Sequence, residues 1–253
     1  MPTLEWIGKS KVINHHQEVP FRVLERKYSF DENGEHSEDN GSDNMIIRGD
    51  NLEALKALLP RYEGRVKCIY IDPPYNTGNE GWVYNDNVND PKIKKWLGEV
   101  VGKEGEDLTR HDKWLCMMYP RLKLLQKLLA DDGVIFISID DREQVLLRMI
   151  CNEIFGENNF LAQFVWQKRT SPDMRKLVST AHEYVCAYCK DISYLPNAIS
   201  KVALSEEDAE NYKNPDNDPR GPWASSDFTA QGFRPNQMYE IITPGGARYT
   251  PPE

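Results

Sequence analysis

The chain lacks any apolar run close to the roughly 20 residues that cross a membrane. Its N-terminal segment also lacks the apolar core of a signal peptide. We therefore predict a cytoplasmic protein with no membrane partner. Cysteine is scarce as well: five residues, an odd number, favour free thiols over a disulfide framework in a chain without an export signal.

Metal-ligand clusters are missing too. His15 and His16 are adjacent, so they point in different directions and lack a partner set for a metal. Cys186 and Cys189 form a Cys-x-x-Cys, but an extended segment would place the two thiols on opposite faces, and no second pair exists. We predict no metal site and structural roles for both histidines.

An excess of positive charge is likewise absent. The formal net charge is −9, which excludes a protein that coats an anionic polymer by bulk attraction. A protein of this charge can still carry one basic face that binds phosphates. Four basic residues form such a local group: Lys168, Arg169, Arg175 and Lys176. Any one of them alone is more simply interpreted as a solvated surface residue.

The most informative stretch that is present is residues 69–78, IYIDPPYNTG. An apolar, β-branched run ends there in a carboxylate, two prolines and an aromatic ring. The prolines fix φ and remove two backbone donors, so we expect the strand to stop and the chain to turn rigidly. The Asp72 carboxylate and the carbonyls of Asp72 and Pro73 then become available as acceptors.

Such a corner can receive a planar ring that carries an exocyclic NH2 group. The amine donates both hydrogens to the oxygens, and the ring stacks on Tyr75 for roughly 1–3 kcal/mol. Adenine N6 and cytosine N4 both fit. Accepting these hydrogens directs the nitrogen lone pair out of the ring plane, where it can attack an electrophilic methyl group.

Asp72-Pro73-Pro74-Tyr75 resembles the catalytic motif of amino-group DNA methyltransferases. Other segments are similar to the adenine-specific modification subunits of type III restriction systems. They are residues 4–9, 14–16, 48–55 (RGDNLEAL), 72–78, 114–125 (WLCMMYPRLKLL), 132–141 (DGVIFISIDD), 182–184 and 214–223 (NPDNDPRGPW).

This resemblance implies transfer of a methyl group from S-adenosylmethionine to a flipped adenine in double-stranded DNA. Asp72, Pro73, Pro74 and Tyr75 would form the catalytic turn, and Asp50 and Asp72 would lie on the cofactor side. The full-length parent would work with a restriction subunit and as a homodimer. The basic group above would contact DNA, as would Trp82 and Tyr84, which could close over the base or only anchor their loop.

The expected fold is α/β: a Rossmann-like, mostly parallel sheet of the S-adenosylmethionine-dependent methyltransferase type, incomplete, with an irregular C-terminal recognition region. Apolar patterns predict strands at 45–49, 66–71, 134–139, 160–166 and 183–189, and helices from 51 to Pro60, over 112–130 and from 140 onward. The first strand, helix and strand would form a parallel crossover unit that brings Asp50 and Asp72 to one crevice.

We expect three parts in the chain. Residues 1–44 form an N-terminal arm and acidic loop, residues 45–190 a partial catalytic core, and residues 191–253 the start of a target-recognition region. The chain contains no Gly-rich strand-to-helix turn of the kind that holds a methyl donor. In the resembled family that turn comes last, so we expect a fragment with weak or absent donor binding and no turnover alone.

Three alternatives stay open. The first is methylation of cytosine N4, because the corner fits both amines. The second is a noncatalytic DNA-binding or assembly fragment, because the donor turn is missing. The third, methylation of protein amides, is disfavoured because that chemistry usually goes with Asn rather than Asp at position 72.

Overall fold

A computed structural model describes most of the chain. The described residues are 3–76, 108–171, 177–200, 202–203, 205, 209–225 and 238–250. The chain divides into two compact units, Met1–Ser200 and Lys201–Glu253. Within the described ranges, no helix has the length and apolarity needed to cross a membrane.

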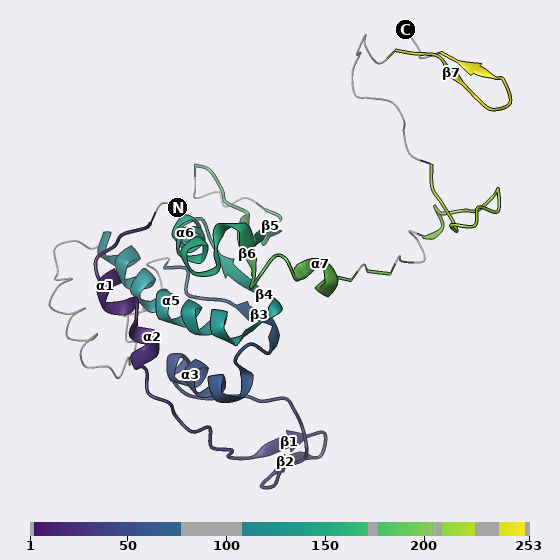
Figure 1. The fold of residues 1–253 in the computed structure, drawn as a ribbon. Helices are drawn as coiled ribbons and strands as arrows, with labels where there is room; N and C mark the ends of the chain where they lie inside the picture. The colour runs from purple at the N-terminus through teal and green to yellow at the C-terminus, as the bar shows by residue number, and fades with distance from the viewer. Residues whose placement is uncertain are drawn as a thin grey trace. The chain divides into compact units, whose positions relative to one another are not determined.

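The first unit is organised around a four-stranded sheet (Figure 1). Its strands are β3 (Val66–Ile71), β4 (Leu129–Ile139), β5 (Phe160–Gln167) and β6 (His182–Cys189), in the spatial order β3-β4-β6-β5. The β3–β4 pair is parallel, and β6 runs antiparallel to both β4 and β5. Strands β3, β4 and β5 therefore share one direction, which confirms a mostly parallel sheet of the α/β class.

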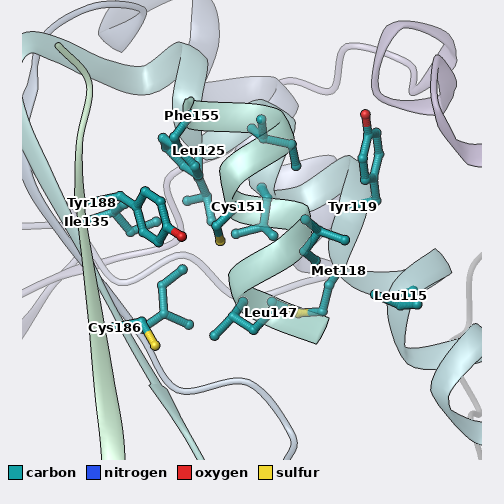
Figure 2. Packing of buried hydrophobic residues seen from close by; sticks show 14 of the residues in the cluster. Leu115, Met118, Tyr119, Leu125, Ile135, Leu147, Cys151, Phe155, Cys186 and Tyr188 are labelled. Carbon is teal, nitrogen blue, oxygen red and sulfur yellow. The ribbon is translucent and has the colours of Figure 1, made fainter. Parts of the chain in front are cut away.

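Two long helices cover the sheet: α5 (Leu108–Leu128) and α6 (Gln144–Phe155). Figure 2 shows the packed interior, with α6 contributing Leu147, Cys151 and Phe155. The sheet contributes alternate residues of β4 and β6, which are completely buried because successive side chains of a strand point to opposite faces. These residues are Ile135, Ile137, Ile139, Cys186 and Tyr188.

The N-terminal arm packs on this core, as expected. It contains the short helices α1 (Lys9–Val12) and α2 (His15–Glu18), and Val12 lies in the main apolar cluster. Both predicted structural histidines, His15 and His16, are buried. At the start of the acidic loop, β1 (Ser29–Asp31) and β2 (Gly34–His36) form a hairpin.

The expected strand at 45–49 is wrong. These residues are irregular, and the Ile46 side chain is fully exposed. Within the described part of the sheet, β3 pairs only with β4. Residues 45–49 therefore have no neighbouring strand there to which their backbone could hydrogen-bond. The predicted crossover unit is therefore not formed, and Asp50 is not the end of a strand.

The following helix, α3 (Asn51–Tyr62), forms as predicted but continues two residues past Pro60. The Asp50 side chain caps it, accepting bonds from the backbone N–H groups of Leu52 and Glu53 at 2.9 and 3.1 Å. Helix α3 packs on α5 through an apolar cluster of its own. That cluster contains Val19, Leu52, Leu59, Leu124 and Leu128.

The second unit is small and is described by itself. Lys213 and Trp223 form an isolated antiparallel bridge, and β7 (Ile241–Ile242) pairs with β8 (Arg248–Tyr249). The remaining described elements belong to the first unit: a 3-10 turn at Glu157–Asn159 and α7 (Leu195–Ala198).

The junction of α5 and β4 also differs from expectation. The helix ends at Leu128 and the strand begins at Leu129, so Gly133 lies inside the strand rather than in a turn. A Cβ atom on Gly133 would lie 2.7 Å from the Val66 carbonyl oxygen and 2.9 Å from that of Ala130. Only glycine permits this close approach of backbone to backbone.

We predict that Gly133→Ala lowers the free energy of unfolding by about 1–3 kcal/mol, because two backbone carbonyls must move to admit the methyl group. Asp131→Ala, at an exposed position of the same strand, serves as the control and should change stability little. Urea unfolding measures both. Equal effects of the two substitutions would contradict the close-approach explanation.

Candidate active site

The predicted catalytic turn lies directly after β3. Ile71, the last residue of the strand, pairs with Ile137 of β4, and residues 72–76 then leave the sheet without regular structure. Asp72 is exposed, Tyr75 is partly buried, and Asn76 is buried. The turn thus presents its carboxylate to solvent while its far end enters the protein.

Tyr75 lies beside Asp72. The Asp72 carboxylate and the Ser138 hydroxyl of β4 both lie near the phenol, and the ring packs against the main apolar cluster. Burial raises the pKa of Tyr75 well above its ordinary value, and the nearby Asp72 carboxylate raises it further. The phenol therefore stays protonated at neutral pH and can donate a hydrogen bond to the carboxylate.

Trp114 supports the turn from α5. Its ring is completely buried, and its indole Nε1–H donates to the Pro74 carbonyl oxygen at 2.7 Å. This bond uses the Pro74 carbonyl and not the Pro73 carbonyl that the predicted chemistry needs. A buried indole with its N–H satisfied is a rigid support, because both the ring and the hydrogen bond restrict its rotamer.

Ser138 links the turn to a second phenol. Its hydroxyl lies 2.7 Å from the Tyr70 hydroxyl of β3, and Ser138 itself is buried. Tyr70 precedes Asp72 by two residues, so the two side chains point to the same side of the chain at the end of β3. Tyr70 is mostly exposed. Two phenols and a serine hydroxyl therefore accompany the exposed carboxylate.

The strand registers bring a basic residue to the same edge. Tyr184 of β6 pairs with both Ile139 of β4 and Val165 of β5, so the end of β5 and the start of β6 reach the edge at which β3 ends. Lys168, just past β5, pairs with Glu183 at 3.1 Å. The charge of Glu183 also contributes to the raised pKa of Tyr75.

The sequence-predicted site residues fall into three groups. Asp72 and Tyr75 lie together, and Lys168 and the exposed Arg169 lie at the same edge of the sheet. Asp50 caps α3, as described above. The predictions for Trp82, Tyr84, Arg175 and Lys176 lie outside the described residues.

Sequence reasoning missed the supporting residues. Trp114 lies in the helix predicted over 112–130, and a signal for its role exists, because a buried indole N–H needs an acceptor. Ser138 and Tyr70 were assigned to strands without a role. In the described part of the chain, no three His, Cys, Asp or Glu residues form a group that could hold a metal ion.

The described residues present acceptor oxygens that can bind an amine, whereas no Gly-rich turn for a methyl donor lies among them. Oδ1 of Asp50 already accepts two helix N–H groups. The residues next to it, 45–49, are irregular and exposed, and the sequence offers no Gly-rich turn. The exposed carboxylate, the rigid turn and the adjacent ring can nevertheless orient a flat ring through its amine.

Comparison with known proteins identifies relatives of the chain. Residues 66–241, more than half of the chain, match the DNA methylase family N6_N4_Mtase. The EcoP15I Mod subunit of Escherichia coli, part of a type III restriction-modification enzyme, is 36% identical over 231 residues, which are 83% of this chain and 35% of that protein. The StyLTI Mod subunit of Salmonella typhimurium is 37% identical over 229 residues, 83% and 34% of the two chains.

The chain thus spans about a third of the length of these curated relatives. Among solved structures, the cytosine-N4-specific PvuII DNA methyltransferase aligns with a TM-score of 0.35 and 17% identity. That alignment covers 63% of this chain and 57% of the other.

We predict that Trp114→Phe lowers the free energy of unfolding by about 1–3 kcal/mol, because the Pro74 carbonyl loses its donor and the smaller ring leaves part of the buried space empty. Trp166→Phe is the control, since Trp166 is 63% exposed on β5 and should change stability by less than about 0.5 kcal/mol. Denaturant unfolding measures both. A Trp114 variant as stable as the Trp166 variant would show that the bond to Pro74 contributes nothing.

Proposed function

The chain belongs to the DNA methylase family, and from that premise we propose that the protein methylates the N6 amine of adenine in double-stranded DNA, as the modification subunit of a type III restriction-modification system. The observation that carries the proposal is the exposed Asp72 carboxylate held beside Tyr75 on a proline-fixed turn. The similarity to type III Mod subunits along 83% of the chain supports it.

The residues of this chain would hold and orient the base. Adenine leaves the duplex at a cost of a few kcal/mol, and its N6 hydrogens are accepted by the Asp72 carboxylate and the Pro73 carbonyl. The adenine ring stacks on Tyr75, which contributes roughly 1–3 kcal/mol. With both hydrogens engaged, the N6 lone pair points out of the ring plane, and the negative carboxylate stabilises the positive charge that develops on nitrogen.

The cofactor of this proposal, S-adenosylmethionine, supplies the methyl group when it is bound. Asp50 and Asp72 are the residues of this chain that we propose on the cofactor side. Asp50 lies at the N-terminus of α3 with its carboxylate already oriented by the cap. Because the Asp50 carboxylate is negative and already occupies the end of the helix, we propose that it faces the positively charged amine of the donor's amino-acid end.

DNA phosphates would be bound at the edge where the turn lies. We propose Lys168 and Arg169 as contacts because both follow β5 at that edge. The sequence adds four further candidates: Arg175, Lys176, Trp82 and Tyr84. Since the net charge is −9, we expect binding through this limited basic group to weaken strongly with added salt.

The proposal extends to partners and location. Two of the relatives are named as Mod subunits of type III restriction-modification enzymes, and we propose a restriction subunit and a second copy of the protein as partners of the full-length form. A reaction on cellular DNA takes place where that DNA lies, which in bacteria is the cytoplasm.

Two other functions compete with this one. Cytosine N4 presents the same two hydrogens to the turn, and the matched family includes both base specificities in its designation N6_N4. A noncatalytic DNA-binding fragment is the second alternative, because the sequence offers no Gly-rich turn. Labelled methyl transfer by the full-length protein to duplexes that contain only adenine or only cytosine as a possible acceptor distinguishes the two bases, and the same assay with this chain alone tests the noncatalytic alternative.

We predict that Asp72→Ala in the full-length protein lowers the rate of methyl transfer by roughly 10²–10³-fold, because the amine loses its charged acceptor. Duplex binding should be unchanged. Asp191→Ala, at a partly exposed carboxylate whose side chain bonds only Ser193 among the described contacts, serves as the control. Asp72 and Asp191 variants of equal activity would refute the proposed role.

We also predict that Tyr75→Phe keeps most of the activity, since the ring still stacks, whereas Tyr75→Ala loses about 5–150-fold in activity. Initial rates with one defined duplex measure both. A Phe variant as impaired as the Ala variant would show that the hydroxyl, rather than the ring face, is the functional group.

A further inference from the structure

One buried charge behind the catalytic turn has no role in the chemistry described so far. Glu143 precedes α6 and its side chain is completely buried. Burying a carboxylate is costly unless donors satisfy it. The ordinary role at this position, a cap on the helix, is not used, because the Glu143 side chain makes no capping bond to α6.

The carboxylate is instead directed at the catalytic turn and at α5. Oε1 of Glu143 accepts a hydrogen bond from the Asn76 side-chain amide at 2.5 Å and lies 2.7 Å from Nδ1 of His111. Oε2 has no hydrogen-bond partner within the described residues. Glu143 therefore joins the end of the turn to the first turns of α5, the helix that also carries Trp114.

The electrostatics are consistent with a constrained group. Burial raises the pKa of Glu143, and the nearby Asp140 charge raises it slightly more. The contacts with Asn76 and His111 lower it and so oppose these effects. The net effect is a raised pKa of Glu143, because burial outweighs the two contacts.

Asn76 is the residue through which Glu143 can act on the turn. It directly follows Tyr75, it is buried, and its backbone φ of 58° lies in the left-handed region, unusual for a residue with a Cβ. Asparagine adopts this conformation more readily than other residues with a Cβ, and a contact to its side chain can select it. The bond to Glu143 is such a contact, since it fixes the side chain of the residue in the strained position.

The turn is thus held at three points. The pairing of β3 with β4 fixes its start, the bond from Trp114 fixes Pro74 in the middle, and the bond from Asn76 to Glu143 fixes its end. Asp72 and Tyr75 lie between these supports. Loss of the last support would leave the backbone after Tyr75 free to rotate, which would redirect the ring.

We propose that Glu143 is a positioning residue for methyl transfer: by holding Asn76 in its left-handed conformation, it directs the Tyr75 ring and the Asp72 carboxylate toward the base. This inference rests on the proposed function. The Glu143 side chain is completely buried and contacts Asn76 and His111, so we expect its effect in the rate of the chemical step rather than in the affinity for DNA.

The experiment compares two carboxylates of the same region in the full-length protein. Glu153 on α6 makes two contacts, with the Tyr119 hydroxyl and with Lys9 Nζ, each at 2.9 Å, and neither partner belongs to the turn. Glu143→Ala should lower the single-turnover rate of methyl transfer about 10–100-fold, with duplex affinity within about twofold, because misplacement of the turn impairs alignment.

Two further variants separate positioning from general stability. Glu153→Ala should lose stability but keep the single-turnover rate. Glu143→Gln should keep the rate within about threefold, because its amide oxygen can still accept the Asn76 bond. A Glu143→Ala variant as fast as Glu153→Ala, or a Gln variant as slow as the Ala variant, would overturn the positioning role.

A double-mutant cycle tests whether the effect passes through Asn76. Asn76→Gly removes the side-chain amide but permits the positive φ. It should slow the single-turnover rate, and adding Glu143→Ala should slow it no further, since the two residues act as one unit. Fully additive effects would overturn the proposed route. If Glu143→Ala does not fold, Asn76→Gly alone decides, and an unchanged rate would refute the inference.

The wild-type protein and Asp72→Ala distinguish failure of this inference from failure of the proposed function. Absence of methyl transfer by the wild type, or full activity of Asp72→Ala, would overturn the function and the inference together. A wild type that methylates DNA and depends on Asp72, but not on Glu143 or Asn76, would overturn the inference alone.

Discussion

The rest of the site depends on one constraint: two consecutive prolines, Pro73 and Pro74, follow one residue after the end of strand β3. Pro73 and Pro74 cannot donate to the sheet and cannot rotate about φ, so the chain must leave β3 in a fixed direction with its carbonyls unpaired by strand neighbours. The protein uses one of these carbonyls itself, through Trp114. The exposed Asp72 carboxylate is then held at the sheet edge by backbone geometry rather than by its own side-chain contacts.

Much of the fold follows from local patterns. Apolar runs predicted β3, β5 and β6 within about one residue, and spacings of three and four predicted α5 and α6. The strand expected at 45–49 failed because a strand also needs a hydrogen-bonding neighbour, which no local pattern reports. The junction at Gly133 failed for a related reason, since its requirement for glycine comes from the carbonyl of Val66 on another strand.

The site was predictable only in part, for a similar reason. Asp72 and Tyr75 are three residues apart, so one short motif contains both the acceptor and the stacking ring. The residues that support them come from distant parts of the chain: Trp114 is 40 residues from Pro74, and Glu143 is 67 residues from Asn76. A short motif specifies which groups react. The contacts that hold those groups in place form only when distant parts of the chain fold together.

The most direct test of the account is a crystal structure of the full-length protein bound to duplex DNA and an unreactive analogue of the methyl donor. The account predicts an adenine outside the duplex, its N6 within about 3 Å of the Asp72 carboxylate and the Pro73 carbonyl, and its ring on the face of Tyr75. A base bound with its amine directed at other residues, or Tyr75 turned away from it, would contradict the account.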